Sequence, residues 1–259
     1  MLIITEAAIT EMVGQYLWPL IRISAFFMAA PIFGTRMVSA RVRVVLAISI
    51  TLIVAPLIPD LPEFTGFNLP TMIVVIQEVI IGAAFGFVFQ VVFHVFILTG
   101  QYIAMKMGLG FASMNDPANG VSVTIVSQFY MLVTTLLFLS INGHLILIQI
   151  LVDSFSTLAV GNFLSLTDLY RIAELGNWMF GSALIISLPV LTALLVVNIA
   201  FGVMSRSAPQ MNIFAVGFPI TLLFGLMIMW VGFSALLPTF NAVIDEGMGF
   251  VQQLLLNRK

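Results

Sequence analysis

Polar and ionisable side chains inside apolar stretches are the residues of this sequence that could take part in chemistry. Glu78, Gln90 and His94 lie within one long apolar run, and Arg22 lies within an earlier one. Charged groups are costly in such surroundings, so a functional interpretation has to be considered first. Under that interpretation, the Glu78 carboxylate and the His94 imidazole form a proton or ion relay.

The spacing of the same residues also fits a structural role. Glu78, Gly82, Gly86, Gln90 and His94 follow one another at intervals of four, so neighbours in the row share a helix face. The Gly82-x-x-x-Gly86 pair permits close contact between helices. The polar side chains then form interhelical hydrogen bonds in a packed bundle, with an arginine from another apolar run as one possible partner for the carboxylate. We favour this interpretation, because a relay needs several carboxylates along a path and the apolar runs hold a single firm one.

Catalytic and metal-binding patterns are not evident. The two histidines, His94 and His144, have no Asp, Glu or second His at ligand spacing, and the chain has no cysteine. No Ser-His-Asp set, paired carboxylates or phosphate-binding loop is recognisable. We therefore expect a protein that is not an enzyme and that uses no metal or cofactor.

The composition indicates a membrane protein. Hydrophobic residues make up 61% of the 259 residues and charged residues only 8%, against about 25% in soluble domains. The mean hydropathy is +1.17. A water-soluble monomer cannot bury this much apolar surface, so the chain must enter a membrane or pack within a large assembly.

The elements that position the polar residues are predicted to be long helices. We expect a single all-α, polytopic domain with about six long apolar helical segments in hairpins. They lie near residues 12–33, 42–58, 71–99, 125–152, 178–203 and 213–240.

Two shorter helices are expected outside these runs. Between residues 153 and 177, a short amphipathic helix is predicted, with Thr167 or Asp168 as its N-cap and Gly176 at its end. A last helix is predicted from Asn241 onward, with acidic residues early and basic residues late.

The stretch Met105–Gly120 lies between two apolar runs but differs from an ordinary polar loop. It combines glycines at 108, 110 and 120 with large apolar side chains, and it carries one cation and one anion. Connectors exposed to water are normally polar. An apolar and flexible stretch suits a deformable hydrophobic stopper.

A second loop, Ser205–Pro219, supports two interpretations. Pro209 breaks the helix, and Gln210 and Asn212 place amide groups beside the break. The loop is either a simple hairpin turn anchored by Arg206 or a structured contact surface for a partner subunit.

Both loops resemble a known family. The stretch G-L-G-F-A-S-M-N-D-P at 108–117 and the pattern S-R-x-x-P-Q-x-N-x-F-x-x-G-x-P at 205–219 are similar to the signatures of the FliR/SctT export-gate family of type III secretion. The resemblance covers essentially the whole chain, and the flagellar branch, FliR, fits better than the injectisome branch.

This resemblance implies an architecture and partners. Residues of about 1–175 would be FliP-like, and about 176–259 would form a FliQ-like helical hairpin with a tail. The chain would join several copies of FliP and FliQ in a helical export gate, with FlhB associated and unfolded flagellar subunits in transit. Its place would be the bacterial inner membrane and flagellar basal body, where apolar helices can sit above the bilayer on other subunits.

The resemblance also implies site residues. The first loop would be a plug that seals the closed pore through Phe111 and Met114, with Gly108 and Gly110 as hinges. The plug would comprise Met105, Met107, Gly108, Leu109, Gly110, Phe111, Met114, Asn115, Asp116 and Pro117. The subunit-contact loop would comprise Arg206, Pro209, Gln210 and Asn212.

A proton-coupled or small-molecule secondary transporter is the alternative function. Such a transporter should have internal inverted repeats and a midplane site formed by broken helices. No pair of matching halves is recognisable in the sequence.

Overall fold

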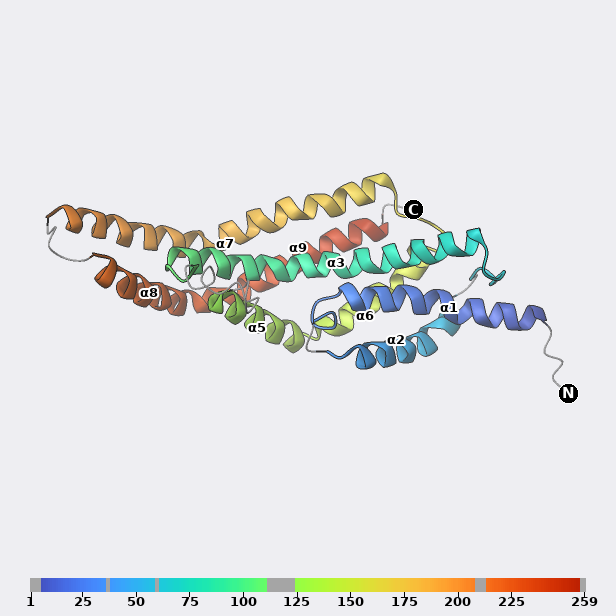
Figure 1. Cartoon of the computed structure of the whole chain (residues 1–259). Coiled ribbons are helices and arrows are strands. Elements are labelled where there is room, and N and C mark those ends of the chain that lie inside the picture. Colours follow the sequence, from blue (N-terminus) through green and yellow to red (C-terminus); the bar gives the residue numbers. More distant parts are fainter. Residues whose placement is uncertain (1–5, 36–37, 59–60, 111–123, 208–212, 257–259) are drawn as a thin grey trace. The chain divides into compact units, whose positions relative to one another are not determined.

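The computed structural model describes residues 6–35, 38–58, 61–110, 124–207 and 213–256. The regular elements in these ranges are all helices, which confirms the predicted all-α class (Figure 1). The α-helices are α1 (Glu6–Ala29), α2 (Ala40–Val54), α3 (Leu69–Lys106), α5 (Ile125–Ser140), α6 (Gly143–Thr157), α7 (Leu166–Ser207), α8 (Ile213–Gly232) and α9 (Leu236–Leu256). Two short 3₁₀ helices, Ala55–Leu57 and Phe233–Ala235, adjoin α2 and α8.

The number of possible membrane spans is smaller than the number of apolar runs. Within the described ranges, four stretches are long and apolar enough to cross a bilayer: Ala40–Leu57, Leu69–Lys106, Leu166–Met204 and Gly217–Gln253. The broken pair α5 and α6 adds a fifth if it counts as one span. The expected six is therefore approximate. Helix α1 is outside this set because Gln15, Pro19 and Arg22 interrupt its apolar run.

The sequence predicts one continuous helical segment at 125–152, but the structure divides it into two helices. Helix α5 ends at Ser140 and α6 begins at Gly143. Between them, Asn142 adopts the left-handed conformation with φ 57°. Asparagine is one of the few residues that tolerate this conformation, and it stops the helical hydrogen-bond pattern.

The separate amphipathic helix ending at Gly176 is a wrong prediction. Helix α7 runs without a break from Leu166 to Ser207. A glycine inside a helix lowers helix stability by only about 1 kcal/mol relative to alanine. The helix therefore continues through Gly176 between its long flanking segments.

The predicted N-cap of this helix, Thr167 or Asp168, is two or three residues too late. Ser165 is the cap: its Oγ accepts from the Asp168 backbone N–H at 3.1 Å. The Asp168 carboxylate in turn accepts from the Ser165 N–H at 2.9 Å and from its hydroxyl at 2.6 Å. This reciprocal arrangement is a capping box.

The last helix also begins earlier than predicted. Helix α8 ends at Gly232, a 3₁₀ turn follows, and α9 starts at Leu236 rather than near Asn241. Pro238 explains the break, because proline has no N–H to donate and its ring clashes with the carbonyl four residues earlier. Asp245 and Glu246 consequently lie in the middle of α9 and not in its first turn.

The helices form two compact units. The first contains α1, α2, α6, the N-terminal part of α3, the start of α7 and the end of α9. Its core includes the fully buried side chains of Trp18, Phe26, Phe27, Ile81 and Phe85. The Trp18 indole N–H donates to the Pro62 carbonyl at 2.8 Å, which ties the connector before α3 to α1.

Helices α1 and α3 approach closely in this unit. A methyl group on Gly86 would lie 2.8 Å from Ala29 Cβ and 2.8 Å from the Phe26 carbonyl oxygen. A methyl group on Gly82 would meet the Arg22 carbonyl oxygen. The close helix contact predicted from the Gly82 and Gly86 pair is confirmed.

The second unit contains the C-terminal part of α3, α5, most of α7, α8 and the start of α9. Ring contacts join Phe93 to Phe138 at 5.2 Å and Phe96 to Phe240 at 5.9 Å between centroids. A buried cluster surrounds the end of α3 and comprises Ile103, Ala104, Met107, Val126, Val190 and Leu194.

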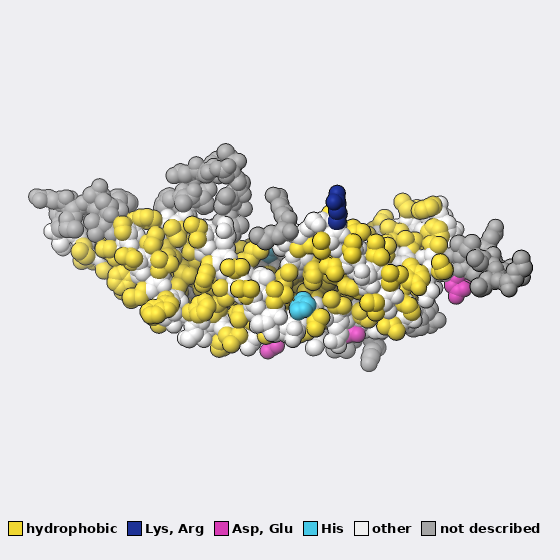
Figure 2. Space-filling view, turned by 90° about the horizontal axis from the view of Figure 1, so that it is seen from below, with side chains coloured by type: hydrophobic (Ala, Val, Ile, Leu, Met, Phe, Trp, Pro, Cys, Tyr) yellow, Lys and Arg dark blue, Asp and Glu magenta, His cyan; other side chains and the backbone are white. Residues whose placement is uncertain are grey.

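Much of the apolar surface is not covered by the chain itself. Only 17% of the most apolar part of α7 is buried, and only 11% of that of Gly217–Gln253, against 39% for α3. Figure 2 shows a face on which hydrophobic side chains predominate and charged side chains are few and scattered. This surface needs lipid or other proteins to cover it.

Candidate functional site

The first part of the candidate site is the C-terminal end of α3, where the predicted plug begins. Gly108 has a positive φ of 82°. Its N–H donates to the Met105 carbonyl at 3.2 Å, and the Leu109 N–H donates to the Ala104 carbonyl at 2.9 Å. These two bonds around a left-handed glycine define a Schellman motif. The glycine expected as a hinge thus has a defined role as the helix terminator.

The side chains at this end of α3 differ in their exposure to solvent. Met105 is 61% exposed, whereas Met107 has no exposed surface. Leu109 packs against the buried cluster of the second unit. Gly110 is half-buried. The remaining predicted plug residues lie outside the described residues: Phe111, Met114, Asn115, Asp116 and Pro117.

The predicted subunit-contact loop follows α7. Arg206 occupies the last turn of α7 and is exposed. A cation at that end of a helix interacts favourably with the helix dipole. Pro209, Gln210 and Asn212 lie outside the described part of the chain.

The second part of the site is a buried ion pair in the first unit. Arg22 of α1 donates from Nε to Glu78 Oε2 at 2.6 Å and from Nη2 to Glu78 Oε1 at 3.0 Å. Both side chains have no exposed surface. The interhelical pairing that the packing interpretation expected is therefore present.

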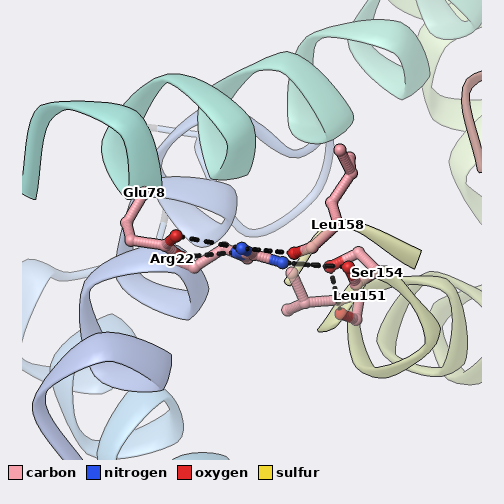
Figure 3. A network of polar contacts seen from close by, with 5 residues as sticks. All are labelled: Arg22, Glu78, Leu151, Ser154 and Leu158. Atoms are coloured by element: carbon pink, nitrogen blue, oxygen red, sulfur yellow. Dashed lines mark hydrogen bonds and ion pairs between the residues drawn. The ribbon is translucent and has the colours of Figure 1, made fainter. Parts of the chain in front are cut away.

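The same guanidinium closes the end of α6 (Figure 3). Its Nη1 donates to the Ser154 carbonyl at 3.0 Å and to the Ser154 hydroxyl at 3.3 Å, and Nη2 donates to the Leu158 carbonyl at 2.8 Å. Ser154 Oγ donates onward to the Leu151 carbonyl at 2.6 Å. The Ser154 carbonyl also accepts from the Leu158 N–H at 2.9 Å, so Arg22 adds a second donor there and supplies a donor to the carbonyl of the C-cap residue Leu158. The negative end of the helix dipole attracts a cation, so the position of Arg22 is favourable for α6.

These contacts use the full donor capacity of Arg22. A guanidinium has five N–H donors, and five acceptor contacts are present here. The Phe155 ring lies 4.3 Å from the guanidinium carbon and adds a cation–π contact. Burying two charges costs several kcal/mol per ion unless such contacts replace the lost water. The geometry supplies these contacts in full.

The network favours packing over a proton relay. Both Glu78 oxygens accept from one arginine, and the side chain is buried. Gln90 and His94, the other members of the row, lie half-buried further along α3. Sixteen residues along a helix span about 24 Å and rotate the last side chain by about 160° from the first. Glu78 and His94 therefore cannot exchange a proton directly.

Several residues of these arrangements were not found from the sequence. Ser154 and Leu158 bind Arg22 mainly through backbone carbonyls, which every residue carries and which leave no pattern. Gln101 of α3, whose Oε1 accepts from the backbone N–H of Thr124 just before α5, does leave a signal, since it is a polar residue within an apolar run. Among the described residues, no three His, Asp or Glu side chains gather as metal ligands would.

Comparisons with known proteins identify the family. A family model described as "Bacterial export proteins, family 1" matches residues 13–247. The "Flagellar biosynthetic protein FliR" of Escherichia coli (strain K12) is 38% identical over 241 residues, which cover 92% of this chain and 90% of that protein.

Two further relatives carry the same name. That of Pectobacterium carotovorum subsp. carotovorum is 37% identical and covers 94% of this chain and 93% of its own. That of Bacillus subtilis (strain 168) is 29% identical and covers 96% of this chain and 97% of its own. The resemblance read from the two loops is confirmed, and the chain belongs to the bacterial export proteins of family 1.

Proposed function

We propose that this chain is a non-enzymatic core subunit of the flagellar type III protein export gate. The observation that carries the proposal is the match over residues 13–247 to the export family, together with relatives named for flagellar biosynthesis along nearly the whole chain. The apolar helices support a membrane location, which we propose to be the inner membrane within the flagellar basal body.

The length of the apolar surface supports assembly with other subunits. The apolar stretch Leu166–Met204 has 39 residues, about 58 Å of helix, whereas the hydrocarbon core of a bilayer is about 30 Å thick. Large exposed apolar side chains occur along all of it, among them Leu166, Phe180, Ile185, Val196, Ile199 and Val203. A bilayer covers about half of this stretch, and we propose that other subunits cover exposed apolar side chains beyond it.

The partners that fit this surface are the other export-gate subunits. We propose FliP and FliQ as neighbours in a helical assembly and FlhB as an associated subunit. In this assembly, residues of about 1–175 are the FliP-like part and about 176–259 the FliQ-like hairpin. Arg206, exposed at the end of α7, begins the proposed subunit-contact loop with Pro209, Gln210 and Asn212.

The segment after α3 is proposed as the plug of the closed channel. A narrow constriction lined by apolar side chains excludes water and ions by dewetting. Methionine is flexible and can repack around a passing chain of varied sequence. Because Met107 is fully buried within the chain, we assign the sealing contacts to Phe111 and Met114.

Removal of the gene from its own bacterium tests the proposed function. We expect the membrane to contain no complete export gate and the culture medium to contain no flagellar filament subunits, while other secretion continues. Expression of the chain from a plasmid should restore both. Normal flagellar export in the deletion strain, with loss of uptake or efflux of a small molecule, would instead support the secondary transporter.

A further inference from the structure

The end of α3 is fixed to α8 by a side chain that fits onto a glycine. Met107, the residue directly after α3, has no exposed surface and lies against Gly225 of α8. A methyl group on Gly225 would lie 2.6 Å from Met107 Cγ, 2.8 Å from Cε and 2.9 Å from Sδ. These distances are far below van der Waals contact, so Met107 can occupy this place only because residue 225 has no side chain.

The two residues after Met107 strengthen this attachment. A methyl group on Gly108 would lie 2.9 Å from the Phe218 ring of α8. The Schellman motif turns the chain at Gly108 and directs Leu109 back onto the buried cluster around Ile103 and Ala104. The backbone up to residue 109 is therefore held against α8 on one side and α3 on the other.

The start of α5 is attached to α3 by a different contact. Gln101 Oε1 accepts from the Thr124 backbone N–H at 3.4 Å and from the Ser127 hydroxyl at 3.2 Å. Thr124 is also the N-cap of α5, since its Oγ1 accepts from the Ser127 N–H at 3.3 Å. Gly100 allows this approach, because a methyl group there would lie 2.6 Å from Ser127 Cα.

Both attachments lie at the C-terminal end of α3. Gln101 belongs to its last two turns and Met107 follows its last residue, six positions later, which is about 9 Å along the helix axis. The Gln101 attachment holds Thr124, the residue after position 123. The Met107 attachment holds the residues before position 111. Packing in the second unit thus defines where the chain leaves α3 and where it returns.

We propose that Gln101, Met107 and Gly225 are positioning residues for the plug, and that they set its place by fixing the chain on both sides of it. This inference rests on the proposed function, because the positioning matters for the seal only if residues 111–117 close a channel. Gln101 and Gly225 belong to α3 and α8, and Met107 directly follows α3, where the plug segment begins. All three precede or lie apart from residues 111–117.

The test compares Gly225→Ala with Gly232→Ala in cells that assemble the whole gate. Both variants add one methyl group to α8, but a methyl on Gly232 meets no atom within 4 Å. We expect G225A to raise ion leakage roughly tenfold, because overpacking a filled site displaces Met107. G232A should remain tight.

A second readout does not depend on the channel. Lys106 is exposed and directly precedes Met107, so trypsin cleavage after Lys106 in the purified complex reports on loosening of this end. We expect faster cleavage in G225A than in G232A. Unchanged leakage and unchanged cleavage in an assembled G225A complex would overturn the proposal.

Two further variants keep the outcomes distinct. Phe111→Ser with Met114→Ser leaves all three positioning residues in place, so a tight F111S/M114S gate refutes the plug, and the cleavage assay then decides the attachment alone. If G225A does not assemble, Gln101→Met decides instead, because it keeps the side-chain length but removes the acceptor for Thr124 and Ser127. Raised ion leakage in an assembled Q101M gate supports the proposal, and a Q101M gate as tight as the wild type contradicts it.

Discussion

Arg22 and Glu78 form a two-point ion pair with no exposed surface, and the same arginine closes the C-terminal end of α6. One side chain therefore joins three helices that are distant in the sequence. The pair is electrically neutral, and its donors are matched by acceptors. Such a group makes the packing specific, because no single partner can be removed without leaving a buried charge or a buried acceptor unpaired.

Glu78→Gln should prevent assembly rather than block transport. The substitution leaves the Arg22 charge buried without its counter-ion, which costs about 3–5 kcal/mol. We expect the amount of assembled gate in the membrane to fall strongly, and export to fall in proportion. Immunoblots of the native complex and of secreted flagellar subunits measure the two quantities.

The matched control and the rescue sharpen this prediction. Glu11 lies exposed on α1, so Glu11→Gln should leave the amount of gate unchanged. The pair R22M/E78M should recover part of the loss, because it removes both charges together. A normal amount of assembled E78Q gate without export would contradict the packing account and support a proton relay.

Gly86→Ala should separate α1 from α3. The added methyl group would lie 2.8 Å from Ala29 Cβ and from backbone atoms of Phe26 and Ala30, which cannot move without a helix shift. We expect a cost of about 1–3 kcal/mol, measured as a lower thermal midpoint of the purified complex.

Gly176→Ala is the control for that variant. Gly176 lies inside α7 with no atom within 4 Å of the added methyl. It should match the wild type or exceed it slightly, because alanine favours a helix by about 1 kcal/mol over glycine. A lower midpoint for G176A than for G86A would contradict the close packing of α1 on α3.

Ser165→Ala should destabilise the start of α7. It removes the hydroxyl that accepts from the Asp168 N–H and donates to the Asp168 carboxylate. Loss of an N-cap costs about 1 kcal/mol, or roughly 2–4 °C in the thermal midpoint. Thr167→Ala should have no such effect, since Thr167 is exposed and lies inside the helix. If T167A lowered the midpoint and S165A did not, Ser165 would not be the cap.

The sequence predicted those features that depend on local patterns. Glycines at positions 82 and 86 predicted the close helix contact, and long apolar runs predicted the helices. The sequence also contained the capping box, since Ser165 and Asp168 have its spacing. It was missed because Thr167 and Asp168 are equally good cap residues by type.

Features that depend on packing could not be predicted from the sequence. Arg22 binds the carbonyls of Ser154 and Leu158, and a carbonyl has no side-chain signature. Met107 and Leu109 look alike in the sequence as apolar residues beside glycines, yet Met107 is fixed on Gly225, more than a hundred residues later. The break at Asn142 depends on a left-handed backbone that an Asn-Gly pair permits but does not require.

The most direct test of the account is ion leakage through an assembled gate that carries Phe111→Ser and Met114→Ser together. These changes keep the length of the segment and leave the Schellman motif and the α5 cap intact. Ser113→Ala is the control within the same segment. The account predicts that F111S/M114S assembles, exports and leaks ions, while S113A stays tight. An assembled F111S/M114S gate that remains as tight as the wild type would contradict the claim that this segment seals the channel.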